Sequence, residues 1–198
     1  MLFIGITGGV GAGKSEILKH LRENPHFLVS EADRIAESLM EPGEEVYNKV
    51  LSLLGKEILA PDGQINRKKM AGIIFADKEK LSGINGIIHP AVKEYVLKEK
   101  RKAEEDGIQI YFLEAALLIE CGYDKICDEL WYIYAEPEVR RERLKESRGY
   151  SDEKIDGIMK SQNDDRVYRE SCSRIIDNSG SIESTLYEID RITGGYKG

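Results

Sequence analysis

The chain has 198 residues, with 29 Lys or Arg and 36 Asp or Glu, so its formal net charge is −7 at pH 7. A composition that is one-third charged and 41% apolar is typical of a folded globular protein and excludes a disordered one. The acidic total argues against a broad nucleic-acid-binding or anionic-membrane-binding surface, although a local basic site can still hold an anion.

The sequence begins without a basic segment, and its longest apolar stretch, residues 108–119, is interrupted by Gln109 and Glu114. We therefore expect neither a signal peptide nor a membrane span. The three cysteines form no CxxC pair, which favours free thiols in a reducing compartment. These features predict a cytoplasmic protein without nucleic-acid or membrane partners.

Short apolar runs alternate with helical patterns along the chain. In chain order we expect a strand at 2–6, a helix at 15–23, a strand at 27–30, helices at 32–40, 45–54, 67–75, 78–88 and 92–105, strands at 108–113 and 130–134, helices at 138–147 and 151–161, a strand at 175–176 and a helix at 182–192. This alternation predicts an α/β fold with a parallel five-stranded sheet flanked by helices. Residues from about 31 to 105 exceed one crossover, so we expect an inserted helical subdomain there.

A glycine-rich segment follows the first predicted strand. Residues 8–15, GGVGAGKS, match G-x-x-x-x-G-K-[ST] and open a predicted helix, as a P-loop NTPase requires. Its backbone N–H groups and the helix N-terminus favour phosphate, Lys14 can reach the β- and γ-phosphates, and the Ser15 hydroxyl can coordinate Mg²⁺. The alternative is a strand-to-helix turn that binds nothing. The predicted ATP-binding residues here are Gly11, Ala12, Gly13, Lys14, Ser15 and Glu16.

The P-loop alone does not separate switches, motors, ATPases and small-molecule kinases. The chain has no Asn/Thr-Lys-x-Asp guanine motif, and it is too short for a motor with accessory domains. A helical insertion together with an arginine-rich later segment is typical of small-molecule kinases.

Asp33 lies just after the second predicted strand, where ligands bind in open α/β sheets. There it could orient and deprotonate an attacking hydroxyl. The alternative is an acidic residue that interacts favourably with a helix N-terminus. His89 precedes Pro90 with no Ser or Cys nucleophile evident nearby, which favours helix entry or substrate contact over catalysis.

A helical lid is predicted at about 137–170. Residues 137–174 carry 10 basic and 9 acidic residues, a net charge of +1, whereas the rest of the chain carries 19 and 27, a net charge of −8. Arg143 and Arg148 could clamp phosphates when such a lid closes. The alternative is a solvated helix in which arginines pair with Glu138, Glu142 and Glu146, and for Arg141 this alternative is favoured.

Five stretches together resemble the dephospho-CoA kinase family over essentially the whole chain. They are the P-loop at 6–15, the acidic segment at 31–36 with 41–43, residues 66–75 with 85 and 88–90, the segment 114–120, and a late set formed by 143–144, 148, 162 and 176–180. Departures from the family pattern are Glu31, Asn66, Ala116, Ile158 and Cys172-Ser173. The last two departures, Ile158 and Cys172-Ser173, fall in or beside the lid. They leave open which arginines of the lid contact ATP.

The resemblance implies transfer of the ATP γ-phosphate to the ribose 3′-hydroxyl of dephospho-CoA, with Mg²⁺ as cofactor and the inserted subdomain binding CoA. It implies Asp33 as base or orienter, and Lys14, Arg143 and Arg148 as phosphate ligands. It places Thr7, Arg67 and His89 on the substrate side, and Asn178 and Gly180 beside adenine. Two alternatives are a kinase resembling nucleoside monophosphate kinases and a nucleotide-dependent switch without phosphotransfer.

Overall fold

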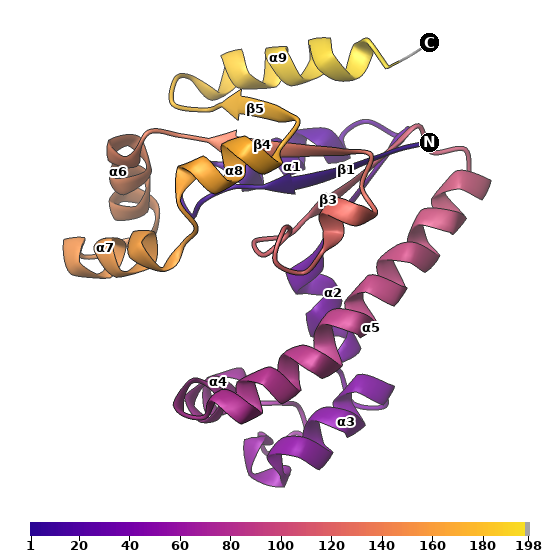
Figure 1. Cartoon of the computed structure of the whole chain (residues 1–198), viewed down its shortest axis with the longest axis vertical. Helices are drawn as coiled ribbons and strands as arrows, with labels where there is room; N and C mark the ends of the chain where they lie inside the picture. The colour runs from indigo at the N-terminus through magenta and orange to yellow at the C-terminus, as the bar shows by residue number, and fades with distance from the viewer. Residues whose placement is uncertain (197–198) are drawn as a thin grey trace. The chain divides into compact units, whose positions relative to one another are not determined.

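The computed structural model describes residues 1–196 (Figure 1). The chain forms two compact units, which we call the sheet unit and the helical unit. The sheet unit comprises residues 1–29 and the chain from residue 106 onward, and the helical unit comprises residues 30–105.

A five-stranded sheet forms the centre of the sheet unit, in the order β2-β3-β1-β4-β5. The strands are β1 (Leu2–Thr7), β2 (Phe27–Glu31), β3 (Ile110–Glu114), β4 (Glu129–Tyr134) and β5 (Arg174–Asp177). Strand β1 pairs in parallel with β3 and β4, and β4 with β5. The predicted α/β fold with a parallel five-stranded sheet is confirmed.

One face of the sheet packs against α1 (Lys14–Arg22) and α9 (Ile182–Gly194). The side chains alternate along each strand, so Ile4 and Ile6 of β1 lie on this face. Phe112 and Trp131 meet edge-to-face there, with ring centres 5.6 Å apart. Trp131, which lies in the strand expected at 130–134, is fully buried in this core.

The opposite face of the sheet is rich in aromatic side chains. Phe3 stacks on Tyr111 with ring centres 4.8 Å apart, and Tyr132 stacks on Tyr168 at 4.7 Å. Tyr168 belongs to α8 (Asp165–Ser171), a short helix that the sequence pattern did not predict. The segment between β3 and β4 includes a 3₁₀ helix at Tyr123–Lys125.

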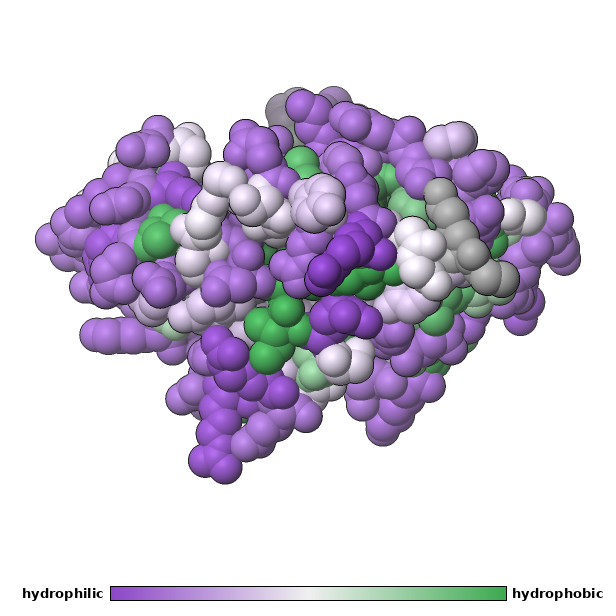
Figure 2. Space-filling model, turned by 90° about the horizontal axis from the view of Figure 1, so that it is seen from above, coloured by the Kyte–Doolittle hydropathy of each residue, from purple (hydrophilic) through white to green (hydrophobic). Residues whose placement is uncertain are grey.

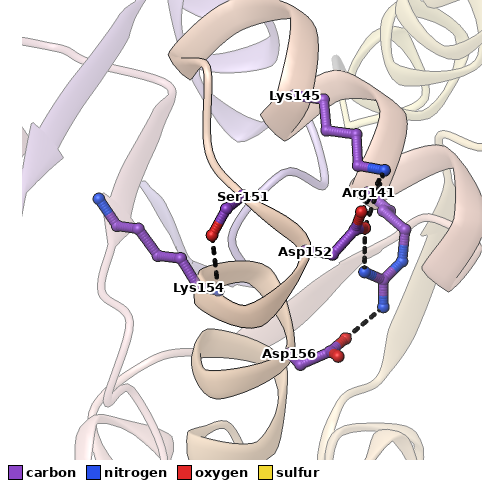
Figure 3. Close-up of polar contacts among 6 residues, drawn as sticks. All are labelled: Arg141, Lys145, Ser151, Asp152, Lys154 and Asp156. Atoms are coloured by element: carbon purple, nitrogen blue, oxygen red, sulfur yellow. Dashed lines mark hydrogen bonds and ion pairs between the residues drawn. The ribbon is translucent and has the colours of Figure 1, made fainter.

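Helices α6 (Pro137–Arg148) and α7 (Asp152–Ser161) follow β4. Arg141 of α6 pairs with Asp152 at 2.8 Å and with Asp156, and Lys145 also pairs with Asp152 at 2.8 Å (Figure 3). Arg141 is therefore a surface ion-pairing residue, as expected. Its partners lie on α7 and not among the glutamates of its own helix.

The helical unit contains α2 (Ala32–Leu39), α3 (Glu45–Leu54), a 3₁₀ helix at Lys56–Ile58, α4 (Arg67–Ala76) and α5 (Lys78–Glu105). A hydrophobic core joins α3, α4 and α5, and its fully buried side chains are Val46, Val50, Leu54, Ile58, Met70 and Ile84. The unit therefore has a core of its own.

The prediction of two helices separated at Pro90 is wrong. Helix α5 is one continuous helix of 28 residues that includes Pro90. A proline inside a helix removes one N–H donor and crowds the preceding turn. Ile84 before Pro90 and Val92 and Val96 after it are all buried. Apolar packing on both sides of Pro90 therefore outweighs the local preference for a break.

The face of the molecule in Figure 2 is mainly hydrophilic, with hydrophobic atoms in small separate groups. None of the helices within residues 1–196 is both long enough and apolar enough to span a membrane.

Candidate active site

The glycine-rich loop connects β1 to α1 and has the backbone geometry of a phosphate site. Gly11 and Gly13 have φ angles of +84° and +88°, values that side chains other than glycine rarely adopt. A Cβ atom at Gly13 would overlap the Asn178 amide, and one at Gly11 would come within 2.9 Å of the Arg140 carbonyl oxygen. The loop thus turns tightly into α1, whose first N–H groups have no intrahelical acceptor and favour an anion.

Backbone carbonyl oxygens of this loop accept hydrogen bonds from the side chains of Lys14, Arg140 and Asn178. Lys14 Nζ donates to the Gly8 oxygen at 2.6 Å. Arg140 Nε donates to the Val10 oxygen at 2.9 Å, and Asn178 Nδ2 donates to the Ala12 oxygen at 2.8 Å. The loop is therefore held by its own lysine, by α6 and by the segment after β5.

Glu114 ends β3 and lies beside the P-loop lysine, with Lys14 Nζ 3.6 Å from its Oε1 atom. Its side chain is largely buried, and β3 pairs directly with β1, with Glu114 opposite Ile6. The sequence reasoning did not select Glu114 as a site residue. Its position at the carboxyl end of a strand adjacent to the P-loop strand was the signal that could have identified it.

Arg143 lies between the P-loop and the loop after β5. Its Nη2 atom donates to the Gly180 oxygen at 3.4 Å. Its Nη1 atom is buried without a hydrogen-bond partner in residues 1–196, and it would lie 3.5 Å from a Cβ atom at Gly13. Arg143, Gly13 and Gly180, which were predicted together as ATP ligands, are therefore neighbours. An unsatisfied guanidinium N–H beside a phosphate loop is suited to an anionic acceptor.

Arg148 is exposed at the end of α6, and its guanidinium lies 5.9 Å from the Tyr150 ring centre. Hydrogen bonding from Arg148 and the nearby charge of Lys154 lower the pKa of Tyr150. The contacts of Arg148 in residues 1–196 do not include the P-loop, and its predicted role on ATP stays a prediction.

Asn178 is buried, with both ends of its amide engaged. Nδ2 bonds the Ala12 oxygen, while Oδ1 accepts a 2.9 Å hydrogen bond from the Thr185 hydroxyl. These contacts make Asn178 a support of the P-loop, and direct contact with ATP stays a prediction.

Thr7 ends β1, immediately before the loop. It is fully buried, and its hydroxyl oxygen has no hydrogen-bond partner within the part of the chain that the structure describes. Buried hydroxyls are normally paired, so Thr7 is an unsatisfied polar group at the start of the loop.

Ser15 and Glu16 are exposed in the first turn of α1. The Ser15 hydroxyl and the Glu114 carboxylate are hard oxygen donors of the type that Mg²⁺ prefers. They come from the P-loop and from the adjacent strand, so the donor set fits a magnesium ion carried with a nucleotide.

The remaining predicted residues belong to the helical unit. Asp33 is exposed in the first turn of α2, and its carboxylate has no ion pair or hydrogen bond within residues 1–196. Arg67 begins α4 and pairs with Glu37 of α2. Asn66 caps α4 by accepting from the Lys69 N–H at 3.0 Å, a role in which Asn and Asp are equivalent. His89 is half-buried in α5, directly before Pro90.

A family model described as dephospho-CoA kinase matches residues 2–184. The chain belongs to the dephospho-CoA kinase family. A curated dephospho-CoA kinase of Carboxydothermus hydrogenoformans is 37% identical over 194 residues, which are 98% of this chain and 94% of that protein.

Two solved structures support the same assignment of fold. The crystal structure of TT1252 from Thermus thermophilus has a TM-score of 0.82 and 26% identity, covering 100% of this chain and 98% of that one. A dephospho-CoA kinase from Campylobacter jejuni has a TM-score of 0.72 and 22% identity, covering 97% and 95%, and shows the shared fold. The dephospho-CoA kinase match includes the P-loop, all of the helical unit and α6. It confirms the family resemblance stated from the sequence motifs.

Proposed function

We propose that the protein transfers the γ-phosphate of ATP to the ribose 3′-hydroxyl of dephospho-CoA, giving coenzyme A and ADP. Family membership supports the substrate pair. The observation that carries the phosphotransfer is the buried, unpartnered Nη1 of Arg143 beside Gly13. A phosphate bound at the P-loop would satisfy this donor.

On the ATP side, the P-loop backbone and the N-terminus of α1 bind the phosphates. Lys14 and Arg143 stabilise the charge on the transferring group in this proposal, because both present cationic N–H donors next to the loop. Arg148 joins them when residues 137–170 act as a lid over ATP. Asn178 and Gly180 border the adenine.

Magnesium would be held by the Ser15 hydroxyl, with Glu114 as the second oxygen donor. When bound with ATP, it neutralises charge on the phosphate oxygens. Glu114 is also within 3.6 Å of Lys14, so its carboxylate compensates the lysine charge inside the sheet unit.

On the acceptor side, the helical unit binds dephospho-CoA. Asp33 orients the 3′-hydroxyl, and Arg67 and His89 contact the substrate. The exposed and unpaired carboxylate of Asp33 is consistent with this role. The Thr7 hydroxyl supplies one further polar contact from the end of β1.

In the reaction, the 3′-oxygen forms a bond to the γ-phosphorus while the bond from that phosphorus to the β,γ-bridging oxygen breaks. ADP leaves with the electron pair, and Asp33 accepts the hydroxyl proton. In a loose transition state this proton leaves late, so Asp33 contributes more by orientation than by basicity.

Steady-state assays with ATP and dephospho-CoA, AMP or CMP as alternative acceptors test the proposal. We expect turnover with dephospho-CoA and a product whose added phosphate is released by a 3′-nucleotidase. Turnover of AMP without turnover of dephospho-CoA would instead identify a nucleoside monophosphate kinase-like enzyme.

The variant Asp33→Asn separates a kinase from a switch. It keeps the shape of the side chain but removes the carboxylate, so kcat should fall about 100-fold or more. Glu45→Gln, an exposed carboxylate on α3, is the matched control and should leave kcat unchanged. Full kcat in Asp33→Asn would contradict the assigned role of Asp33.

A further inference from the structure

Arg140 connects the P-loop to the end of α7 through a single side chain. Its Nε atom donates to the Val10 oxygen at 2.9 Å, and its Nη2 atom donates to Gln162 Oε1. Gln162 is the C-cap residue of α7.

The fit between Arg140 and the loop is close. A Cβ atom at Gly9 would overlap the Arg140 guanidinium, and a Cβ atom at Gly11 would lie 2.9 Å from the Arg140 carbonyl oxygen and 3.1 Å from the Leu144 side chain. The first two turns of α6 therefore pack directly on the glycines at positions 9 and 11. This packing leaves the loop little freedom while Arg140 stays in place.

The surroundings of Arg140 leave its charge uncompensated by an ion pair. Within residues 1–196 it forms no salt bridge, and the nearby Asp165 instead accepts a hydrogen bond from Tyr132 at 2.9 Å and pairs with Arg169. Burial lowers the pKa of Arg140, but arginine remains protonated in proteins. A fixed positive charge therefore lies against the backbone that would hold the phosphates.

We propose that Arg140 is a positioning residue that fixes the Gly9–Val10 backbone and couples the position of α7 to the geometry of the P-loop. This inference rests on the proposed function, because it assigns the loop to ATP. It differs from the role of Arg143, which has an unsatisfied N–H for phosphate. The guanidinium of Arg140 instead donates its hydrogen bonds to Val10 and Gln162 of the protein itself.

Four variants test the coupling: Arg140→Ala, Arg140→Lys, Gln162→Ala and the double variant Arg140→Ala/Gln162→Ala. Arg140→Ala should lower kcat/KM for ATP about 10- to 100-fold, since a small misplacement of a reacting group has effects of this size. The KM for dephospho-CoA should stay within about twofold. Arg140→Lys should recover part of the loss, because an ammonium group can replace one of the two hydrogen bonds but not both.

Gln162→Ala should have a smaller effect than Arg140→Ala, and the double variant should match Arg140→Ala alone, because the two residues act through one link. Arg191→Ala, which removes an exposed arginine of α9, is the control and should leave kcat/KM unchanged. The proposal is overturned if the kcat/KM for ATP of Arg140→Ala stays within twofold of the natural protein. It is also overturned if the fold-losses in kcat/KM of Arg140→Ala and Gln162→Ala multiply in the double variant.

Amide hydrogen exchange of the peptide containing residues 8–13 gives a readout that does not depend on the acceptor. Arg140→Ala should raise exchange in this peptide about tenfold, and Arg191→Ala should not. If the natural protein binds ATP but does not phosphorylate dephospho-CoA, the proposed function fails while the exchange experiment still decides the role of Arg140. Unchanged exchange in Arg140→Ala would overturn the inference by itself.

Discussion

The side-chain amide of Asn178 donates a 2.8 Å hydrogen bond to the backbone oxygen of Ala12, a residue 166 positions earlier in the chain. Its other end accepts from Thr185 of α9. The conformation of the P-loop therefore depends on the loop after β5 as well as on its own glycines.

Asn178→Ala should lower the free energy of unfolding by about 1–3 kcal/mol, because it removes the side-chain donor to the Ala12 oxygen and leaves the Thr185 hydroxyl with only its longer contacts to the Asp177 and Ser181 oxygens. It should also lower kcat/KM for ATP, since Ala12 belongs to the P-loop. Urea unfolding and steady-state kinetics measure the two effects. Thr185→Ser keeps the hydroxyl and serves as the control. Equal stability of Asn178→Ala and the natural protein would show that these hydrogen bonds contribute nothing.

Lys14→Ala should reduce kcat by about 10³-fold or more, because it removes a full charge next to the transferring phosphoryl group. The exposed Lys19 on the same helix provides the control variant Lys19→Ala, for which we expect unchanged kinetics. A decrease of less than tenfold for Lys14→Ala would mean that Lys14 does not act on the phosphate.

Arg143→Ala should lower kcat about 10²- to 10³-fold while the melting temperature changes little. The expected stability is near that of the natural protein because, within residues 1–196, Arg143 makes one long hydrogen bond, to Gly180, and buries an Nη1 atom without a partner. Circular dichroism melting and kinetics on the same sample separate the two effects. Unchanged kinetics would mean that Arg143 is a solvated helix residue with no role in phosphate transfer.

The half-buried thiol of Cys172 makes the free energy of unfolding depend on pH in the alkaline range. Burial raises the pKa of Cys172 to about 11, whereas an unfolded cysteine titrates near 8.5. Between these values the folded protein binds more protons than the unfolded chain, so the free energy of unfolding falls as the pH rises from about 8.5 to 11. The midpoint of urea unfolding should therefore fall more steeply with pH in the natural protein than in Cys172→Ala. Equal slopes of the urea midpoint against pH in the two proteins would contradict the raised pKa of Cys172.

Local sequence patterns were sufficient to predict the strands of the sheet and the P-loop. The five strands are short apolar runs bounded by turn residues, and Gly13, Lys14 and Ser15 occur in a motif whose spacing carries its own geometry. Helix α5 was predicted as two helices, because burial of Ile84 and Val96 outweighs the helix-breaking effect of Pro90 and cannot be seen from the local pattern. Helix α8 was missed because it has only seven residues and one buried side chain, Tyr168.

The site residues that sequence reasoning missed are those defined by long-range contacts. Arg140 resembles Arg141 in sequence, yet one contacts Val10 of the P-loop and the other Asp152 on the surface. Their positions on α6 differ by one residue, which is about 100° around the helix axis. Only the packed helix distinguishes them.

The insertion of residues 32–105 between β2 and β3 has a consequence for the order of folding. Strand β1 pairs with β3 through residues such as Leu2 and Ile110, which are distant in sequence, whereas the core of the helical unit is built from one continuous segment. Closing a long loop is entropically unfavourable, and a loop that is already compact reduces this cost. We expect the helices of 30–105 to gain protection first in pulsed hydrogen exchange during refolding, with the parallel sheet forming afterwards.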